Sequence, residues 1–253
     1  TGFQTCAFRS LLTPKIKNLL RTSASDNLLL FINDQLVQIP WELLFDGEEF
    51  LCLKYSMGRI VSTRQNVLNP YNQRRAGTLS MLIIADPEGN LDIAYKEGIK
   101  IRDEIGIEAN FVKVNLASSK VDTHYVKKNI RDFDVIHYAG HADYNSEEPS
   151  KSSWVLYDGK WIASEILKLS GGAPMPVLVF SNACHSGRTQ EWQIKENFEN
   201  EVYGLANAFL HSGVSHYIGT FWEVLDSPSS LFAIEFYRAL IGNASIGKAL
   251  QYA

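Results

Sequence analysis

Short apolar runs alternate with amphipathic segments from residue 80 to the end of the chain. Two of these runs, SMLIIA at 80–85 and VLVFS at 177–181, are almost continuously apolar, which is typical of strands buried on both faces. We predict strands at residues 80–85, 111–115, 135–139, 177–181 and 215–221. We predict helices at residues 91–105, 121–132, 164–169, 201–212, 227–241 and 245–253. This alternation indicates parallel βαβ units, so we expect an α/β fold with a mostly parallel sheet flanked by helices.

The first 63 residues carry a less regular pattern. We predict a helix at 10–22, a short helix near Pro40, and strands at 28–32, 36–39 and 58–63. The turn signal Asn33-Asp34 indicates that the strand at 36–39 returns on the strand before it. A polar stretch at 64–77 follows and is the best candidate for a boundary. We therefore expect a smaller N-terminal half at 1–77 and a larger region at 78–253.

Two of the predicted strands end in chemically reactive residues. One continues as HYAGHAD through His141, and the other continues as SNACHSG through Cys184, 43 residues later. In parallel sheets, ligands and reactive groups gather at the carboxyl ends of the strands. A Cys–His pair makes a nucleophile, because the imidazole takes the thiol proton and the thiolate attacks a carbonyl. The small residues Gly140 and Gly187 would let a substrate backbone approach this pair closely.

Each of these residues also has a structural interpretation. A single cysteine after an apolar strand is usually a core residue, and the paired occurrence with a histidine is what favours catalysis. We expect His137, inside the strand, to be a packed residue that holds the loop. His185 ranks second as the base, because a neighbour in sequence usually points elsewhere. Cys6 and Cys52 lie outside the pair, and we expect them to be structural.

Composition excludes several other classes of protein. Lys and Arg number 24 against 28 Asp and Glu, a net charge of −4, so a direct contact with nucleic acid is not expected. No apolar run reaches the roughly 20 residues that span a bilayer, and we expect a cytoplasmic protein. Three scattered cysteines make neither a disulfide framework nor a CxxC zinc site. HExxH, GxSxG and phosphate-loop motifs are absent, so we expect no metal and no cofactor.

The motifs HYAGHADYN and VLVFSNACHSG, with a crossover of roughly 40 residues, resemble the caspase-like cysteine peptidases. That clan includes caspases, legumain, gingipains and separase. Further segments narrow the resemblance to the CHAT domain, a module often found after TPR helices in bacteria. These are LFINDQLVQIPWELLFDGEEFL, IIADPEGNLDIAYKEGIKI, YGLANAFLHSGVSHYIGTFWEVLDSPSSLFAIEFYRAL and SIGKALQYA. The resemblance covers about 28–253, and it implies a caspase-like layered fold preceded by a partial, non-catalytic half.

By position, the resemblance implies His141 as general base and Cys184 as nucleophile, acting as a dyad without an acidic third member. The oxyanion hole would use the backbone N–H groups of Cys184 and Ala142, where the family often has glycine. The acidic and aromatic segment before the last long helix corresponds to Trp222, Glu223 and Asp226. In separase the similar segment holds a P1 arginine, so we expect a basic residue before the cut. Two alternatives stay open: Asp226 caps the following helix, or the aromatic residues select an apolar P1.

We expect a cysteine endopeptidase that cleaves a protein substrate once a partner or an attached sensor region activates it. One alternative is an inactive caspase-like scaffold that only binds proteins, and another is a small-molecule acyl transferase or hydrolase. The resemblance implies partners such as attached TPR repeats or an RNA-guided CRISPR effector of bacterial defence, and pore-forming gasdermins as another kind of substrate. We also expect the chain to be part of a longer protein. The polar stretch 189–200, directly after the nucleophile, would order on activation.

Overall fold

The computed structural model describes residues 12–33, 36, 39–62, 78–145, 148–171, 174–184, 201–220 and 226–253. The chain divides into two compact units. The smaller unit consists of residues 1–65 together with 238–253, and the larger unit consists of residues 66–237. The sequence analysis divides the chain after residue 77 into a non-catalytic half and a catalytic region, and that division stays a prediction.

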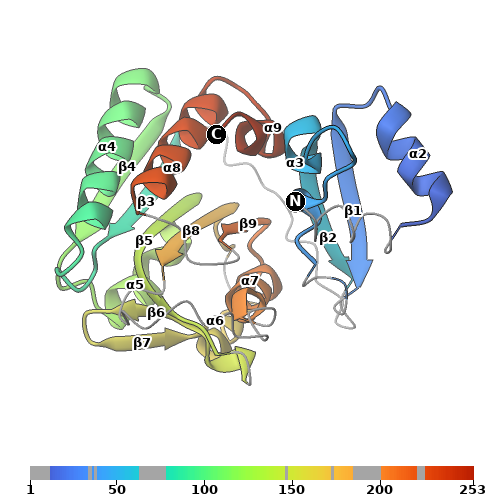
Figure 1. Cartoon of the computed structure of the whole chain (residues 1–253). Coiled ribbons are helices and arrows are strands. Elements are labelled where there is room, and N and C mark those ends of the chain that lie inside the picture. The colour runs from blue at the N-terminus through green and yellow to red at the C-terminus, as the bar shows by residue number, and fades with distance from the viewer. Residues whose placement is uncertain are drawn as a thin grey trace. The chain divides into compact units, whose positions relative to one another are not determined.

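A parallel sheet of five strands forms the centre of the larger unit (Figure 1). The spatial order is β4 (Val112–Ser118), β3 (Leu79–Ala85), β5 (Val135–Asp143), β8 (Leu178–Cys184) and β9 (His216–Gly219). The chain passes from β3 to β4 on one side and then to β5 on the other, so the strand order reverses between β3 and β5. Ligands of open α/β sheets bind outside the carboxyl ends of the strands at such a reversal.

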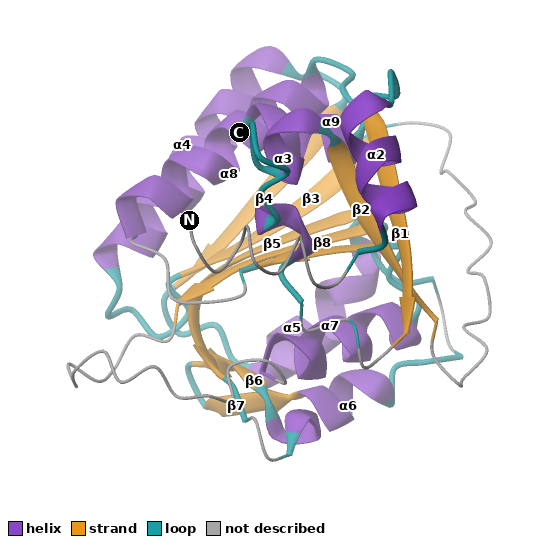
Figure 2. Ribbon diagram, turned by 45° about the vertical axis from the view of Figure 1, so that its right-hand side comes forward, coloured by secondary structure: helices purple, strands orange, loops and turns teal. Residues whose placement is uncertain are grey.

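Helices cover both faces of this sheet (Figure 2). The helices α4 (Asp92–Glu108) and α8 (Asp226–Ile241) lie over one face, and α5 (Thr123–Asn129), α6 (Ala163–Leu167) and α7 (Glu201–Ser212) lie on the other side. Two 3₁₀ turns, η2 (Ile130–Asp132) and η3 (Pro149–Lys151), complete the described helical elements of the larger unit. Along β5 the side chains alternate, with Ile136 and Tyr138 in the core beneath α5 and α7 and His137 bonded to α4 and α8. This layered arrangement confirms the predicted fold class.

Strand β5 is longer than the sequence pattern predicts. The apolar run stops at Ala139, but the strand continues to Asp143, so His141 lies within the strand and not after it. The strand is extended because Ala142 and Asp143 pair antiparallel with Trp154 and Ser153 of β6 (Ser153–Leu156). Ladder hydrogen bonds there compensate for the lack of an apolar pattern.

The pairing partner is a hairpin of β6 (Ser153–Leu156) and β7 (Gly159–Ile162), which the sequence analysis does not predict. Its two-residue turn is Tyr157-Asp158, and Gly159, the first residue of β7, has a φ of +137° that suits glycine. The hairpin buries Trp154 and Trp161 completely. The Trp154 ring stacks on Tyr138 of β5 with ring centroids 4.2 Å apart. The hairpin is therefore anchored to the sheet by aromatic packing.

The smaller unit contains a two-stranded sheet with short helices. Its elements are α2 (Pro14–Thr22), β1 (Asn27–Asn33), η1 (Trp41–Leu43), α3 (Leu51–Lys54), β2 (Ser56–Ser62) and α9 (Ile246–Tyr252). The prediction of a return strand at 36–39 is wrong for the described residues, since Leu36 lies in a turn and Ile39 in a bend. β1 pairs instead in parallel with β2, and parallel strands need a crossover, which η1 and α3 supply.

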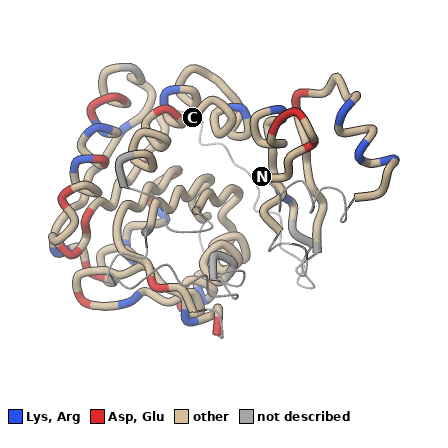
Figure 3. The backbone as a smooth tube through the Cα atoms, in the orientation of Figure 1, with Lys and Arg blue, Asp and Glu red and all other residues tan. Residues whose placement is uncertain are grey.

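Charged residues of both signs are mixed along α4, whereas α2 in the smaller unit carries only Lys and Arg among its charged residues (Figure 3). Among the described residues, no helix combines the length and apolar character needed to cross a membrane.

Candidate active site

His141 and Cys184 are neighbours across two adjacent strands. In the parallel pair β5–β8, the register matches His141 with Cys184, as it matches His137 with Phe180 at the other end of the pair. Adjacent strands are about 4.8 Å apart, so the two backbones are held at close range by ladder hydrogen bonds. The side chain of Cys184 lies outside the described part of the structure. The fold thus brings together two positions that the sequence separates by 43 residues.

The imidazole of His141 faces the loop that follows β3. Its Nε2 atom lies 3.1 Å from Oδ1 of Asn90 and 3.9 Å from Oε2 of Glu88. The His141 side chain is 17% exposed, so it stands at the edge of the protein and remains open to solvent on one side. A base that exchanges protons with a bound substrate needs this kind of partial exposure.

A buried carboxylate shapes the loop that carries Asn90. Asp86 Oδ1 accepts hydrogen bonds from the backbone N–H groups of Gly89, Asn90 and Leu91, at 2.9, 2.8 and 2.9 Å. The Asp86 backbone N–H donates to Ala139 O of β5, which ties the loop to the neighbouring strand. Asp86 itself has a φ of +51° and Gly89 a φ of +80°, so the loop turns sharply at both positions.

The other predicted residues of β5 lie in closely packed surroundings. A Cβ atom added at Gly140 would come within 2.9 Å of Pro87 Cδ and of the Tyr138 hydroxyl. Gly140 therefore lets the loop after β3 pack directly on β5. Ala142 is 5% exposed and pairs with Trp154 of the hairpin, so its backbone is part of an ordered ladder.

His137 lies on the same face of β5 as His141 and belongs to a buried network of hydrogen bonds. Its Nε2 lies 2.8 Å from Glu97 Oε1 of α4, and its Nδ1 lies 3.2 Å from the Tyr237 hydroxyl of α8. Asn182 of β8 donates from Nδ2 to both carboxylate oxygens of Glu97, at 2.9 Å each. His137 is completely buried, and Glu97 is 3% exposed. Four elements of the larger unit are thus joined by groups that satisfy one another inside the protein.

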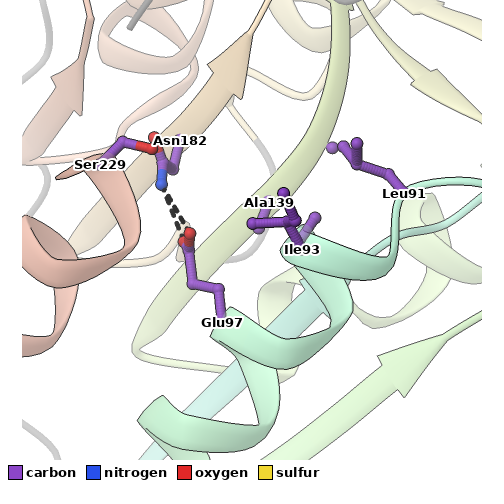
Figure 4. Close-up of a pocket in the computed structure, with 8 residues that line it drawn as sticks. Leu91, Ile93, Glu97, Ala139, Asn182 and Ser229 are labelled. Atoms are coloured by element: carbon purple, nitrogen blue, oxygen red, sulfur yellow. Dashed lines mark hydrogen bonds between the residues drawn. The ribbon is translucent and has the colours of Figure 1, made fainter. Parts of the chain in front are cut away.

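A hollow opens on this face between α4 and α8 (Figure 4). Figure 4 shows Asn182 and Glu97 joined by hydrogen bonds, with Ser229 beside Asn182 and with Ala139 and Leu91 further along the hollow. Asn182 lies two residues before Cys184 in β8. The hollow therefore borders the strand that carries the predicted nucleophile.

Burial changes the titration of several groups near and away from this site. Burial, with a smaller contribution from Glu97, raises the pKa of Tyr237 well above its usual value, so its hydroxyl stays protonated. The thiol of Cys52, in the smaller unit, has a pKa raised mainly by partial burial and also by the charge of Glu42. A raised pKa leaves little thiolate at neutral pH, which fits the predicted structural role of Cys52.

Several predicted residues lie outside the described residues. These are Cys6, His185, Gly187, Trp222, Glu223 and the stretch 189–200. Asp226 is the first residue of α8, and only its backbone is described. Among the described residues, no group of three or more His, Cys, Asp or Glu side chains could hold a metal ion.

The sequence analysis did not single out Asn90, Asp86, Glu97 or Tyr237. A signal for Glu97 exists, because it falls on the buried face of α4 with Ala94, Ile101 and Ile105, where a charged residue is unusual. No sequence periodicity could have predicted the position of Asn90, because this residue lies in a loop whose path depends on hydrogen bonds to Asp86.

Comparison with known proteins assigns the family. A search of curated proteins finds no significant match to this chain. The family model of the CHAT domain matches residues 5–253, nearly the whole sequence. The chain therefore belongs to the CHAT domain family, which is related to the caspase-like cysteine peptidases.

Proposed function

We propose that this protein is a cysteine endopeptidase in which Cys184 is the nucleophile and His141 the general base. The observation that carries the proposal is the register of β5 and β8, which sets these two residues opposite each other at the carboxyl edge of the sheet. Family membership supports the same chemistry. The partial exposure of His141 supports it further, because a purely structural histidine is usually enclosed, as His137 is.

The reaction follows from the chemistry of the pair. The imidazole of His141 accepts the proton from Cys184 Sγ, and the thiolate attacks the carbonyl carbon of the scissile peptide bond. The imidazolium then gives its proton to the departing amine nitrogen, which leaves a thioester on Cys184. His141 next takes a proton from water, whose oxygen attacks the thioester. The carboxyl product leaves, and the thiol is regenerated.

The tetrahedral intermediates carry a negative oxygen that needs hydrogen-bond donors. We assign this role to the backbone N–H groups of Cys184 and Ala142. In support, Ala142 is held in the ladder with β6, so a donor there would be preorganised before the reaction starts. We also assign Gly140, one residue before the base, to contact with the substrate backbone. Pro87 and the Tyr138 hydroxyl fill the space that a Cβ there would need, so this contact would be made by backbone atoms of Gly140.

The substrate is a protein, and we propose a basic residue at P1. The residues assigned to its recognition are Glu223 and Asp226, with Trp222 beside them. A peptide library tests this: selection of Asp or Glu at P1 contradicts it, and selection of Leu or Met assigns the pocket to the aromatic residues.

We further propose that the peptidase acts in the cytoplasm and is switched on by an attached sensor region or a partner, such as TPR repeats or an RNA-guided CRISPR effector. The polar stretch 189–200 is the segment assigned to that switch. Hydrogen exchange over these residues with and without the activator measures it. Equal protection in both states would place the regulation elsewhere.

Replacing the nucleophile tests the proposal. Cys184→Ala should abolish cleavage, a loss of several orders of magnitude, while leaving the fold intact. Cys52→Ala is the matched control, because it also removes one thiol but lies in the smaller unit. The assay is a cleavage screen of the full-length protein against the products of neighbouring genes. Retained cleavage in Cys184→Ala would rule out the assignment, and cleavage by none of the forms would favour a binding scaffold.

A further inference from the structure

The loop after β3 places one polar side chain on the predicted base. Asn90 Oδ1 lies 3.1 Å from His141 Nε2, and no other step of the proposed reaction uses Asn90. We propose that Asn90 is a positioning residue, which holds His141 in the tautomer with the proton on Nε2 and so makes Nδ1 the atom that receives the thiol proton. This inference rests on the proposed function and adds a third member to its dyad.

The tautomer follows from the hydrogen-bonding capacity of the two groups. An amide oxygen can only accept, so a bond between Asn90 Oδ1 and Nε2 requires a hydrogen on Nε2. A neutral imidazole has one N–H, and therefore Nδ1 keeps its lone pair and can act as the base. When Nδ1 takes the proton from Cys184 Sγ, the ring becomes a cation and Nε2–H still donates to Asn90. The carboxylate of Glu88, 3.9 Å from Nε2, faces the same nitrogen and favours that cation.

The position of Asn90 is fixed by its backbone and not by burial of its side chain. The Asn90 side chain is exposed, whereas Asp86, which holds the Asn90 backbone N–H at 2.8 Å, is 6% exposed. The backbone oxygen of Asp86 also accepts from Ser119 N at 3.0 Å, at the end of β4. The loop is thus anchored to both strands that flank β3. A side chain at position 90 can change without disturbing this anchor.

Close packing against β5 fixes the distance between His141 and the loop that follows β3. Pro87 is buried, and its ring occupies the space that a Cβ on Gly140 would need, one residue before His141. The loop and the base therefore share one contact surface, at the point where the strand order reverses. The hydrogen bond between Asn90 and His141 joins two side chains whose backbones are both held in place by packing. It therefore restricts the orientation of the imidazole ring more than a bond between residues on mobile backbones would.

The rate of alkylation of Cys184 by iodoacetamide tests the inference without a known substrate. The rate constant at Cys184 is measured by mass spectrometry between pH 5 and pH 10 in the full chain. In Asn90→Ala we expect the rate at neutral pH to fall about three- to tenfold, the effect of one solvent-accessible hydrogen bond, with the profile displaced to higher pH. Asn90→Asp keeps an acceptor for Nε2–H and should retain the wild-type profile or exceed its rate.

Matched controls separate this inference from the function on which it rests. Asn129→Ala removes an exposed asparagine that bonds only within its own helix region, to Tyr125 O, and should leave the profile unchanged. An Asn90→Ala profile equal to that of Asn129→Ala would overturn the inference. If His141→Ala also left the rate unchanged, the proposed pair itself would fail. A slowed His141→Ala with an unaltered Asn90→Ala would remove only the positioning role.

The tautomer can also be read directly. The ¹⁵N chemical shifts of His141 distinguish Nε2–H from Nδ1–H in the neutral protein. We expect the Nε2–H form in the wild type and in Asn129→Ala, and a mixture of forms in Asn90→Ala. A wild-type protein with the proton on Nδ1 would contradict the inference, since Asn90 would then be donating from its amide nitrogen.

Discussion

The two histidines of β5 stand four residues apart on the same face of one strand, yet their surroundings differ completely. His137 is fully buried, and its ring contacts Glu97 and Tyr237 from two helices. His141 is partly exposed and faces a loop, with Asn90 and Glu88 near Nε2. Position along the strand, and not residue type, therefore separates an enclosed imidazole from one that is open to solvent on one side.

The comparison also concerns charge. Glu97 is a buried carboxylate that three hydrogen bonds from His137 and Asn182 satisfy, so it is committed to the interior. Glu88 is 28% exposed and lies at 3.9 Å, a distance at which it acts through space on the His141 ring. We expect Glu97 to stabilise the fold, and we expect Glu88 to interact electrostatically with His141 when the imidazole becomes protonated.

Removing the outer imidazole should give the largest effect. His141→Ala is expected to reduce cleavage by at least about a thousandfold, because the thiol loses its base, with little change in the free energy of unfolding. The measurements are cleavage of the substrate found in the screen and urea denaturation. His124→Ala, an exposed histidine of α5, is the matched control. If His185→Ala proved more damaging than His141→Ala, the base would have been assigned wrongly.

Breaking the inner network should act on stability instead. Glu97→Ala is expected to lower the free energy of unfolding by about 3 kcal/mol, since it leaves buried polar groups of His137 and Asn182 without an acceptor. Asp103→Ala, on the exposed side of the same helix, should cost less than about 0.5 kcal/mol. Urea denaturation of the two variants checks this. Equal stabilities would show that the network contributes nothing to the fold.

Alkaline pH should lower the free energy of unfolding through Tyr237, whose hydroxyl contacts His137 of β5. Its pKa is raised by burial, so the native state keeps a proton that the unfolded chain loses near pH 10. The unfolding free energy should therefore be undiminished below about pH 10 and fall as the pH rises above it. Tyr237→Phe should make that fall less steep. Denaturation series at pH 8 and pH 11 give the slopes, and parallel slopes would contradict the assignment.

The smallest effect concerns the cysteine outside the pair. The raised pKa of Cys52 predicts slow alkylation at neutral pH that accelerates only in alkaline solution. Cys184, beside His141, should react faster than Cys52 at pH 7. Mass spectrometry after a short exposure to iodoacetamide compares them within one sample. Faster labelling of Cys52 would indicate that the proposed pair does not activate its thiol.

The sequence predicted the layered fold because buried parallel strands leave a strong apolar signal, as in β3 and β8. It missed the end of β5, where pairing with β6 and not an apolar pattern extends the strand to Asp143. Its prediction of a return strand at 36–39 was wrong, because a turn signal does not say which strand pairs with the strand before the turn. Long-range pairing decides both features.

The candidate site shows the same limit. His141 and Cys184 could be predicted, since reactive residues at strand ends are visible in sequence and match a family pattern. Asn90 could not, because its place beside His141 depends on three hydrogen bonds to Asp86 and on packing of Pro87 against Gly140. Loop positions fixed by buried polar groups have no periodicity to detect.

The most direct test of the pair is to map where an irreversible peptidyl acyloxymethyl ketone reacts, using the full-length protein with its activator. Such reagents label a cysteine only when a catalytic base and a substrate groove act on it together. We predict one adduct per chain, on Cys184, that is lost in His141→Ala and retained in His124→Ala. An adduct on another residue, or labelling of Cys184 that does not depend on His141, would contradict the proposal.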